Sequence, residues 1–171
     1  TLVPYMPTSG EFKTKPTQHS VKELRAIGIH PDIIVCRSVL KLSQELKSKI
    51  SLFCDVRPEA VFGVHDASSI YAVPLMLEEE KMDSIIMDML SLVKKPGTEL
   101  RILKSYVDKM QACTKTVTIA IAGKYVALED AYISVVEAVK HASVNNGFVP
   151  KLKWINTEKI DAFFQQCEEY D

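Results

Sequence analysis

The chain of 171 residues lacks several features that would define its class at once. It has no run of 18 apolar residues, so no segment is predicted to span a membrane. Its formal net charge is only −1, which gives no global reason to expect a nucleic acid or a membrane surface as a partner. Its four histidines are scattered without metal-ligand spacing. Any anion site must therefore come from local clustering of charge.

Cysteine is also sparse, and the four residues lie far apart with no C-x-x-C pair. This usage fits a reducing compartment and predicts a cytoplasmic protein. Cys36 and Cys54 lie in apolar runs, where a cysteine is usually a small buried hydrophobe. The N-terminus has neither an initiator Met nor the charged start of a signal peptide, and we expect it to begin inside a domain.

Known nucleotide-binding and hydrolase motifs are absent as well. Gly123-Lys124 follows an apolar run and invites comparison with a P-loop. The comparison fails because Thr118 stands where the motif needs Gly and Tyr125 stands where it needs Ser or Thr. No G-x-G-x-x-G, G-x-S-x-G or H-E-x-x-H motif occurs.

What is present is an ordinary globular mixture, 47% hydrophobic and 25% charged. Residues 33–36 and 60–64 are short continuous apolar runs, with a helical pattern at 42–54 between them. Another helix is predicted for 18–27, with Gly28 as its C-terminal cap. Strands without polar alternation predict an α/β fold with a parallel sheet covered on both faces.

The second half of the chain repeats this alternation after a helical stretch, 71–92, and a breaker at Lys94-Lys95-Pro96-Gly97. We place a domain boundary within 95–116, and we expect residues 33–36 and 60–64 to share one sheet and 117–122 to belong to another. The later elements form a predicted βαβ unit followed by the start of a helix. They are a helix at 98–113, a strand at 116–122, a helix at 130–143, a strand at 151–155 and a helix at 157–168.

Two lysines before the first helix predict a phosphate-binding cradle. Lys13 and Lys15 are two apart in a segment that Pro16 biases toward an extended conformation, so their side chains are expected on one side. Pro16 suits the first helical position, or Thr17 caps the helix. The helix N-terminus would then aim its dipole at the same space. The alternative is two unrelated surface lysines beside a loop.

Polar residues follow both apolar runs of the first half. Arg37 follows the first run, and His65-Asp66 follow the second. Ligands of open parallel α/β sheets bind beyond the carboxyl ends of strands, so these residues predict a second site. The alternative is the ordinary polarity of strand ends.

Several segments resemble one family closely and in order. The stretch from Lys13 to Leu24, which begins KTKPTQHS, is similar to a signature of CTP synthases. His65, where bacterial members often carry Lys, makes the chain look more like eukaryotic members. The other segments that carry the resemblance are Asp32–Arg37, Lys49–Cys54, His65–Pro74, and Gly123-Lys124-Tyr125 with Asp130-Ala131-Tyr132 and Ser134-Val135.

The resemblance implies a three-part organisation. Residues 1–95 would be the carboxyl-terminal part of a P-loop-like synthetase (amidoligase) domain, 96–115 a linker helix, and 116–171 the first βαβ unit of a class I glutamine amidotransferase domain. The implied site for UTP and its product CTP comprises Lys13, Thr14, Lys15, Pro16, Thr17, Gln18 and Lys49. The implied ATP site comprises Arg37, His65, Asp66 and Ala67.

The family aminates UTP to CTP with ATP, magnesium and ammonia released from glutamine, with GTP as an allosteric activator. It forms homotetramers and filaments. The family's P-loop, magnesium carboxylates and Cys/His/Glu triad have no counterpart in this sequence, so we expect an inactive internal fragment without catalytic residues or metal ligands. Two other interpretations stay open: a non-catalytic assembly or regulatory module, and a nucleotide-binding α/β domain without synthase chemistry.

Overall fold

The computed structural model describes residues 1–93, 99–126 and 128–158. The chain divides into two compact units, Thr1–Arg101 and Ile102–Asp171. The predicted breaker at 94–97 lies outside the described residues, and so does the predicted terminal helix from residue 159 onward. Each unit holds a parallel two-stranded sheet of its own, so the chain has the predicted α/β character.

The sheet of the first unit pairs β3 (Ile34–Ser38) with β4 (Val61–His65) in parallel, from Ile34 opposite Val61 to Ser38 opposite His65. Both strands lie within two residues of the predicted runs. The start of the chain lies along the other side of β3, where Leu2 bridges Arg37 in parallel. Three parallel segments, namely the start of the chain, β3 and β4, therefore reach the same edge of this sheet.

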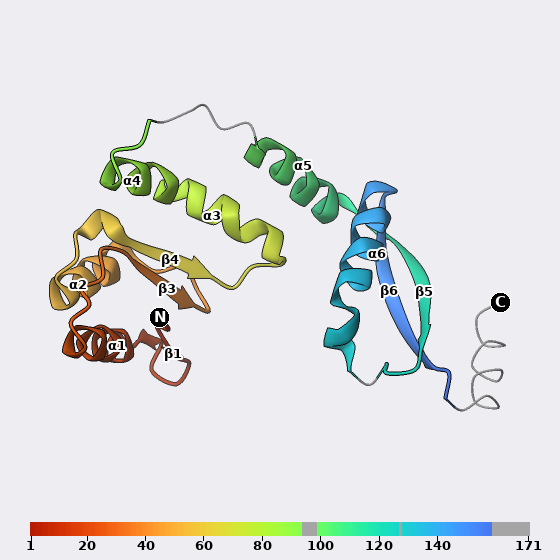
Figure 1. The fold of residues 1–171 in the computed structure, drawn as a ribbon, viewed down its shortest axis with the longest axis horizontal. Coiled ribbons are helices and arrows are strands. Elements are labelled where there is room, and N and C mark those ends of the chain that lie inside the picture. The colour runs from red at the N-terminus through yellow and green to blue at the C-terminus, as the bar shows by residue number, and fades with distance from the viewer. Residues whose placement is uncertain (94–98, 127, 159–171) are drawn as a thin grey trace. The chain divides into compact units, whose positions relative to one another are not determined.

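Two helices cover one side of this sheet, α1 (Lys15–Ala26) and α2 (Gln44–Cys54), and Figure 1 shows α3 and α4 on the other side. The predicted cap at Gly28 is confirmed, since its φ of 85° is the left-handed value that glycine adopts freely. The Ser43 side chain accepts a hydrogen bond from the Leu46 amide, 3.3 Å away, and so caps α2. The core between these layers consists of Val3, Val21, Ile34, Cys36, Leu42, Ile50, Cys54, Val56, Ala60 and Val61.

A small hairpin precedes α1 and is absent from the sequence prediction. It pairs β1 (Tyr5–Met6) with β2 (Glu11–Phe12) in antiparallel fashion. The rings of Tyr5 and Phe12 lie 5.1 Å apart on it, and Gly10 supplies the positive φ of the turn. The hairpin sets the direction in which Lys13 leaves the sheet and enters α1.

The prediction of one continuous helix over 71–92 is wrong, because the structure interrupts it. Short 3-10 turns at Pro58–Ala60 and Ile70–Ala72 flank β4, and the helical stretch is divided into α3 (Val73–Glu79) and α4 (Met82–Met89). Lys81 separates them with φ 60° and ψ 30°. A non-glycine residue in this left-handed region is strained.

The second unit begins within α5 (Glu99–Ala112) and continues with β5 (Lys115–Gly123), which pairs in parallel with β6 (Phe148–Asn156). A 3-10 turn, Glu129–Tyr132, leads into α6 (Ile133–Asn145), which connects the two strands. The predicted separation of 117–122 from the first sheet is confirmed. In the described part of the chain, no helix is long and apolar enough to cross a bilayer.

We expect Lys81→Gly to stabilise the first unit. Glycine removes the strain of the left-handed conformation but adds freedom to the unfolded chain, so the net gain should be about 0.5–1 kcal/mol. Urea unfolding of the full chain, followed by far-UV circular dichroism, measures this change.

Lys22→Gly is the matched control, because Lys22 is exposed within regular α1. The same substitution there should destabilise by roughly 0.5–1 kcal/mol. The fluorescence of Trp154, on β6 of the second unit, serves as an internal reference in both variants. Equal destabilisation by the two glycines would contradict the strain assigned to Lys81.

Candidate functional site

A cleft of about 860 Å³ lies at the start of α1. Lys13 reaches it from the segment after β2, Lys15 from the first position of α1, and Lys49 from α2. All three lysines are exposed. The structure thus brings together Lys13 and Lys15, predicted to form a phosphate cradle, and Lys49, which the family resemblance assigned to the same nucleotide. The full lining is Gly10, Glu11, Phe12, Lys13, Thr14, Lys15, Pro16, Ser43, Glu45, Leu46 and Lys49.

Glu11 is a member of this cleft that the sequence interpretation missed. Its carboxylate lies 2.6 Å from the Lys13 ammonium. The hydrogen bond and charge of Lys13 lower the pKa of Glu11, and the charge of Lys49 contributes in the same direction. Both lysines therefore face the carboxylate. The signal was available, because Glu11 and Lys13 are two apart and residues two apart share a side in an extended segment.

The beginning of α1 differs from the predicted geometry. Lys15 is already the first helical residue, so Lys13 and Lys15 are not two residues of one extended segment. Thr14, rather than Thr17, is the N-cap residue, and no side-chain hydrogen bond caps the helix. Pro16 lies in the first turn, where a missing N–H is tolerated.

The two threonines of this segment are buried and bonded within the chain. The Thr17 hydroxyl donates to the Leu2 carbonyl at 3.1 Å and so ties α1 to the start of the chain. The Thr14 hydroxyl accepts a hydrogen bond from the side-chain amide of Gln18 at 3.1 Å. These residues position the start of α1 behind the lysines.

The strand-end residues also come together. Arg37 on β3 and Asp66 just after β4 form an exposed ion pair with 3.6 Å between Nη2 and Oδ1. The Asp66 amide donates to the Ser38 carbonyl at 3.1 Å, which continues the ladder beyond the strands. His65 ends β4, and Ala67 follows Asp66; both are half-buried. The parallel register places this group at the carboxyl edge of the sheet, as predicted.

The cysteines of the first unit are part of its core. Cys36 and Cys54 are both fully buried, as predicted. Burial raises the pKa of the Cys36 thiol to about 11 and also raises the pKa of Cys54. A thiol that resists ionisation is a poor nucleophile. Among the described residues, no group of three or more His, Cys, Asp or Glu side chains could hold a metal ion.

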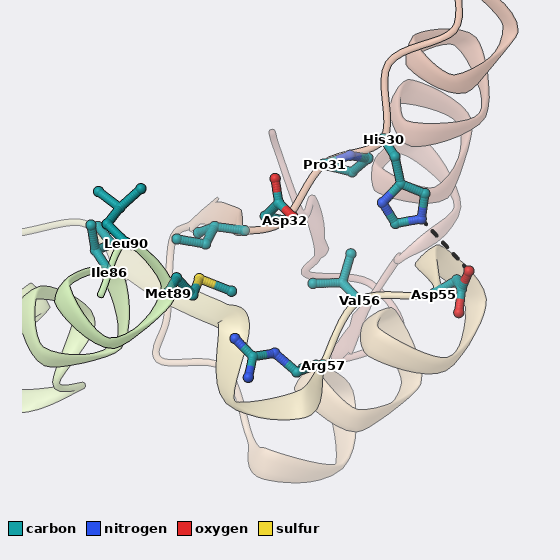
Figure 2. A pocket seen from close by; sticks show the side chains of 10 residues that line it. His30, Pro31, Asp32, Asp55, Val56, Arg57, Ile86, Met89 and Leu90 are labelled. Atoms are coloured by element: carbon teal, nitrogen blue, oxygen red, sulfur yellow. Dashed lines mark ion pairs between the residues drawn. The ribbon is translucent and has the colours of Figure 1, made fainter. Parts of the chain in front are cut away.

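A second cleft, of about 710 Å³, opens at the amino ends of β3 and β4 (Figure 2). Figure 2 shows Ile86, Met89 and Leu90 of α4 on one side of it, and the ion pair of His30 and Asp55, 3.6 Å between Nε2 and Oδ2, on the other. Ligands of parallel α/β sheets bind at the opposite, carboxyl ends. This cleft is therefore not the candidate nucleotide site.

The comparisons with known proteins identify the family. A family model described as CTP synthase N-terminus matches residues 1–92. The chain therefore belongs to the CTP synthase family, a family of ligases. The matched region contains both the lysine cleft and the strand-end group.

Curated relatives extend the similarity over most of the chain. A CTP synthase of Pelotomaculum thermopropionicum is 53% identical over 161 residues, which is 94% of this chain and 30% of that protein. CTP synthases of Bacillus cytotoxicus and Bacillus mycoides are 50% and 49% identical over 162 residues. The chain thus spans about 30% of the length of these relatives. They are bacterial proteins and give no support to the eukaryotic-like character expected from His65.

We expect Glu11→Gln to strengthen anion binding by the cleft. The carboxylate competes with an anion for Lys13, and the neutral amide removes this competition. The Glu11–Lys13 pair is exposed, and exposed pairs contribute little, so a gain of about fivefold at most in affinity for inorganic tripolyphosphate is expected. Calorimetric titration of the full chain at pH 7 measures it.

Glu45→Gln is the control, since Glu45 lines the same cleft while Lys13 pairs with Glu11 and not with Glu45. It should change the affinity by less than about threefold through general electrostatics alone. At a pH below the lowered pKa of Glu11, wild type and Glu11→Gln should converge, because the carboxyl is then neutral in both. A gain that persists unchanged at acid pH would contradict the competition.

Proposed function

We propose that this chain is part of an enzyme that aminates UTP to CTP with ATP and with ammonia from glutamine. The observation that carries the proposal is the convergence of Lys13, Lys15 and Lys49 on one cleft. Three ammonium groups suit a ligand with several linked phosphates. Membership of the CTP synthase family supplies the chemistry that a pyrimidine triphosphate would undergo there.

In this proposal, the lysines bind the triphosphate of UTP or CTP, and α1 contributes the positive end of its dipole. Thr14, Thr17 and Gln18 act from behind, by holding the first turn of α1 in place. Lys13 would exchange Glu11 for a phosphate oxygen when the nucleotide enters. These lysines would recognise the charge of the triphosphate, and other residues would distinguish uracil from cytosine.

We assign ATP to the carboxyl edge of the sheet, beside Arg37, His65, Asp66 and Ala67. The support is their convergence on that edge and the general preference of ligands for it. Arg37 is suited to a phosphate because its guanidinium is always charged and presents several donors. In the described part of the chain, no group of three or more His, Cys, Asp or Glu side chains could hold a magnesium ion beside this ATP.

We further propose the wider context that the family resemblance implies. Residues 1–95 would be the carboxyl-terminal part of the synthetase domain, 96–115 a linker, and 116–171 the first βαβ unit of a glutamine amidotransferase domain. The parallel pairing of β5 and β6 around α6 is compatible with such a unit. A cytoplasmic homotetramer that forms filaments and responds to GTP belongs to the same proposal.

The first test of this proposal uses Lys13→Ala and Lys15→Ala in the full-length enzyme that contains these residues. Each variant should raise KM for UTP and relieve inhibition by CTP, because both nucleotides carry the same triphosphate. A lost hydrogen bond to a charged group costs roughly 1.5–3 kcal/mol, so each effect should be about tenfold to a hundredfold. Saturation curves for UTP and for ATP on the same variant measure it.

KM for ATP should change much less, because these lysines lie in the cleft and not at the strand-end edge. Lys41→Ala is a suitable control: Lys41 is an exposed lysine that pairs with Glu79 at 3.1 Å, outside the cleft. A variant in which the ATP curve shifts and the UTP curve does not would reverse the two assignments.

The second test uses the purified chain of residues 1–171. We expect it to form no CTP from UTP, ATP and ammonia and to hydrolyse no glutamine, because the family's P-loop and thiol nucleophile motif have no counterpart in it. CTP formation is followed by its absorbance change, with protein from a host that lacks its own synthase. Turnover under these conditions would overturn the assignment of the chain as a part of the enzyme.

A further inference from the structure

A nearly buried ion pair lies between α2 and the end of α3, away from both candidate sites. The Lys47 ammonium and the Glu80 carboxylate form it, and their side chains are only 11% and 15% exposed. Burying two charges costs several kcal/mol per ion unless further hydrogen bonds compensate them. The pair therefore calls for an explanation beyond surface solubility.

Glu80 bonds to the sheet as well as to Lys47. One carboxylate oxygen faces Lys47 and the other accepts the Gly63 amide at 2.9 Å. Gly63 lies in the middle of β4, and its amide points away from β3, toward Glu80. Glu80 therefore satisfies a backbone donor of an edge strand. The helix α3, which ends at Glu79, lies against β4 (Figure 1).

Lys47 extends the same contact to α2. Its stem passes over β4 so closely that a Cβ on Gly63 would lie 3.4 Å from Lys47 Cε. Two residues further along α2, Lys49 reaches the lysine cleft. Each residue of an α-helix is rotated by about 100° from the one before, so residues two apart point to nearly opposite sides. Lys47 therefore points toward β4, and Lys49 points toward the cleft.

The same pair thus joins one element of each proposed site, α2 and β4. α2 carries Lys49 at the triphosphate cleft, and β4 leads directly into His65 and Asp66 at the strand-end edge. We propose that Lys47 and Glu80 are positioning residues that fix the register of α2 against β4, and so the distance between the two bound nucleotides. This inference rests on the proposed function.

The expected kinetic result is a split between kcat and KM. Each site keeps its own side chains when the pair is broken, so each nucleotide still binds. Their mutual geometry is what changes, and a misplacement of about an ångström can cost as much as roughly a hundredfold in rate. Loss of the pair should therefore lower kcat about tenfold or more, with KM for UTP and for ATP within about threefold of wild type.

The experiment uses the full-length enzyme with ammonia as the nitrogen source, in the variants Lys47→Met and Glu80→Gln. Glutamine at position 80 keeps an acceptor for the Gly63 amide and removes only the charge. Lys47→Arg keeps the charge and should retain most of the wild-type kcat. Circular dichroism at the assay temperature verifies that each variant is folded.

The neighbouring exposed pair provides the matched controls. Lys41 and Glu79 are 64% and 70% exposed and join the same two regions of the chain, one residue before Glu80. Lys41→Met and Glu79→Gln should keep kcat within about twofold, since exposed pairs contribute little.

The outcomes separate this inference from the proposed function. If folded Lys47→Met and Glu80→Gln enzymes keep the wild-type kcat, or if Lys47→Arg loses as much as Lys47→Met, the positioning role is overturned while the function stands. The same holds if kcat falls only in proportion to the folded fraction. A wild-type enzyme that forms no CTP overturns the proposed function, and this inference with it.

Discussion

The parallel pairing of β3 with β4 is the constraint on which the rest of the first unit depends. Its register sets Ser38 opposite His65, and the Asp66 amide extends the ladder by one more bond. Because parallel strands end at the same edge, residues nearly thirty positions apart in the sequence are brought within ion-pairing distance there. The start of the chain joins the same sheet through Leu2 and, through Thr17, holds α1 against it.

Much of this arrangement could be predicted from the sequence, because it depends on local apolar patterning. The runs that became β3 and β4 lack polar alternation, and the spacing of Leu42, Leu46 and Ile50 is that of one face of a helix. The position of Arg37, His65 and Asp66 at one edge of the sheet follows from the prediction of these two parallel strands. The assignment of Lys49 to the same cleft as Lys13 came from family resemblance, since no local pattern relates two residues so far apart.

The features that escaped prediction are short or non-local. The two-residue strands of the hairpin are too brief to show a period, and a lysine gives no sign that it will break a helix, as Lys81 does between α3 and α4. The contact of Lys47 with Glu80 joins positions 33 apart. In the sequence, Glu80 is one of three consecutive glutamates that resemble a solvated surface, and only the fold distinguishes it from Glu79.

If the lysine cleft binds a triphosphate as proposed, the carboxylate of Glu11 has a consequence for selectivity among phosphorylated ligands. A nucleoside monophosphate that enters the cleft trades one carboxylate–ammonium contact at Lys13 for one phosphate–ammonium contact, an exchange of nearly equal terms. A longer polyphosphate makes the same trade and can also reach Lys15 and Lys49. Because of Glu11, the first phosphate contact brings almost no net gain in binding free energy to any ligand. Only ligands with further phosphates, which contact Lys15 and Lys49, would then bind tightly.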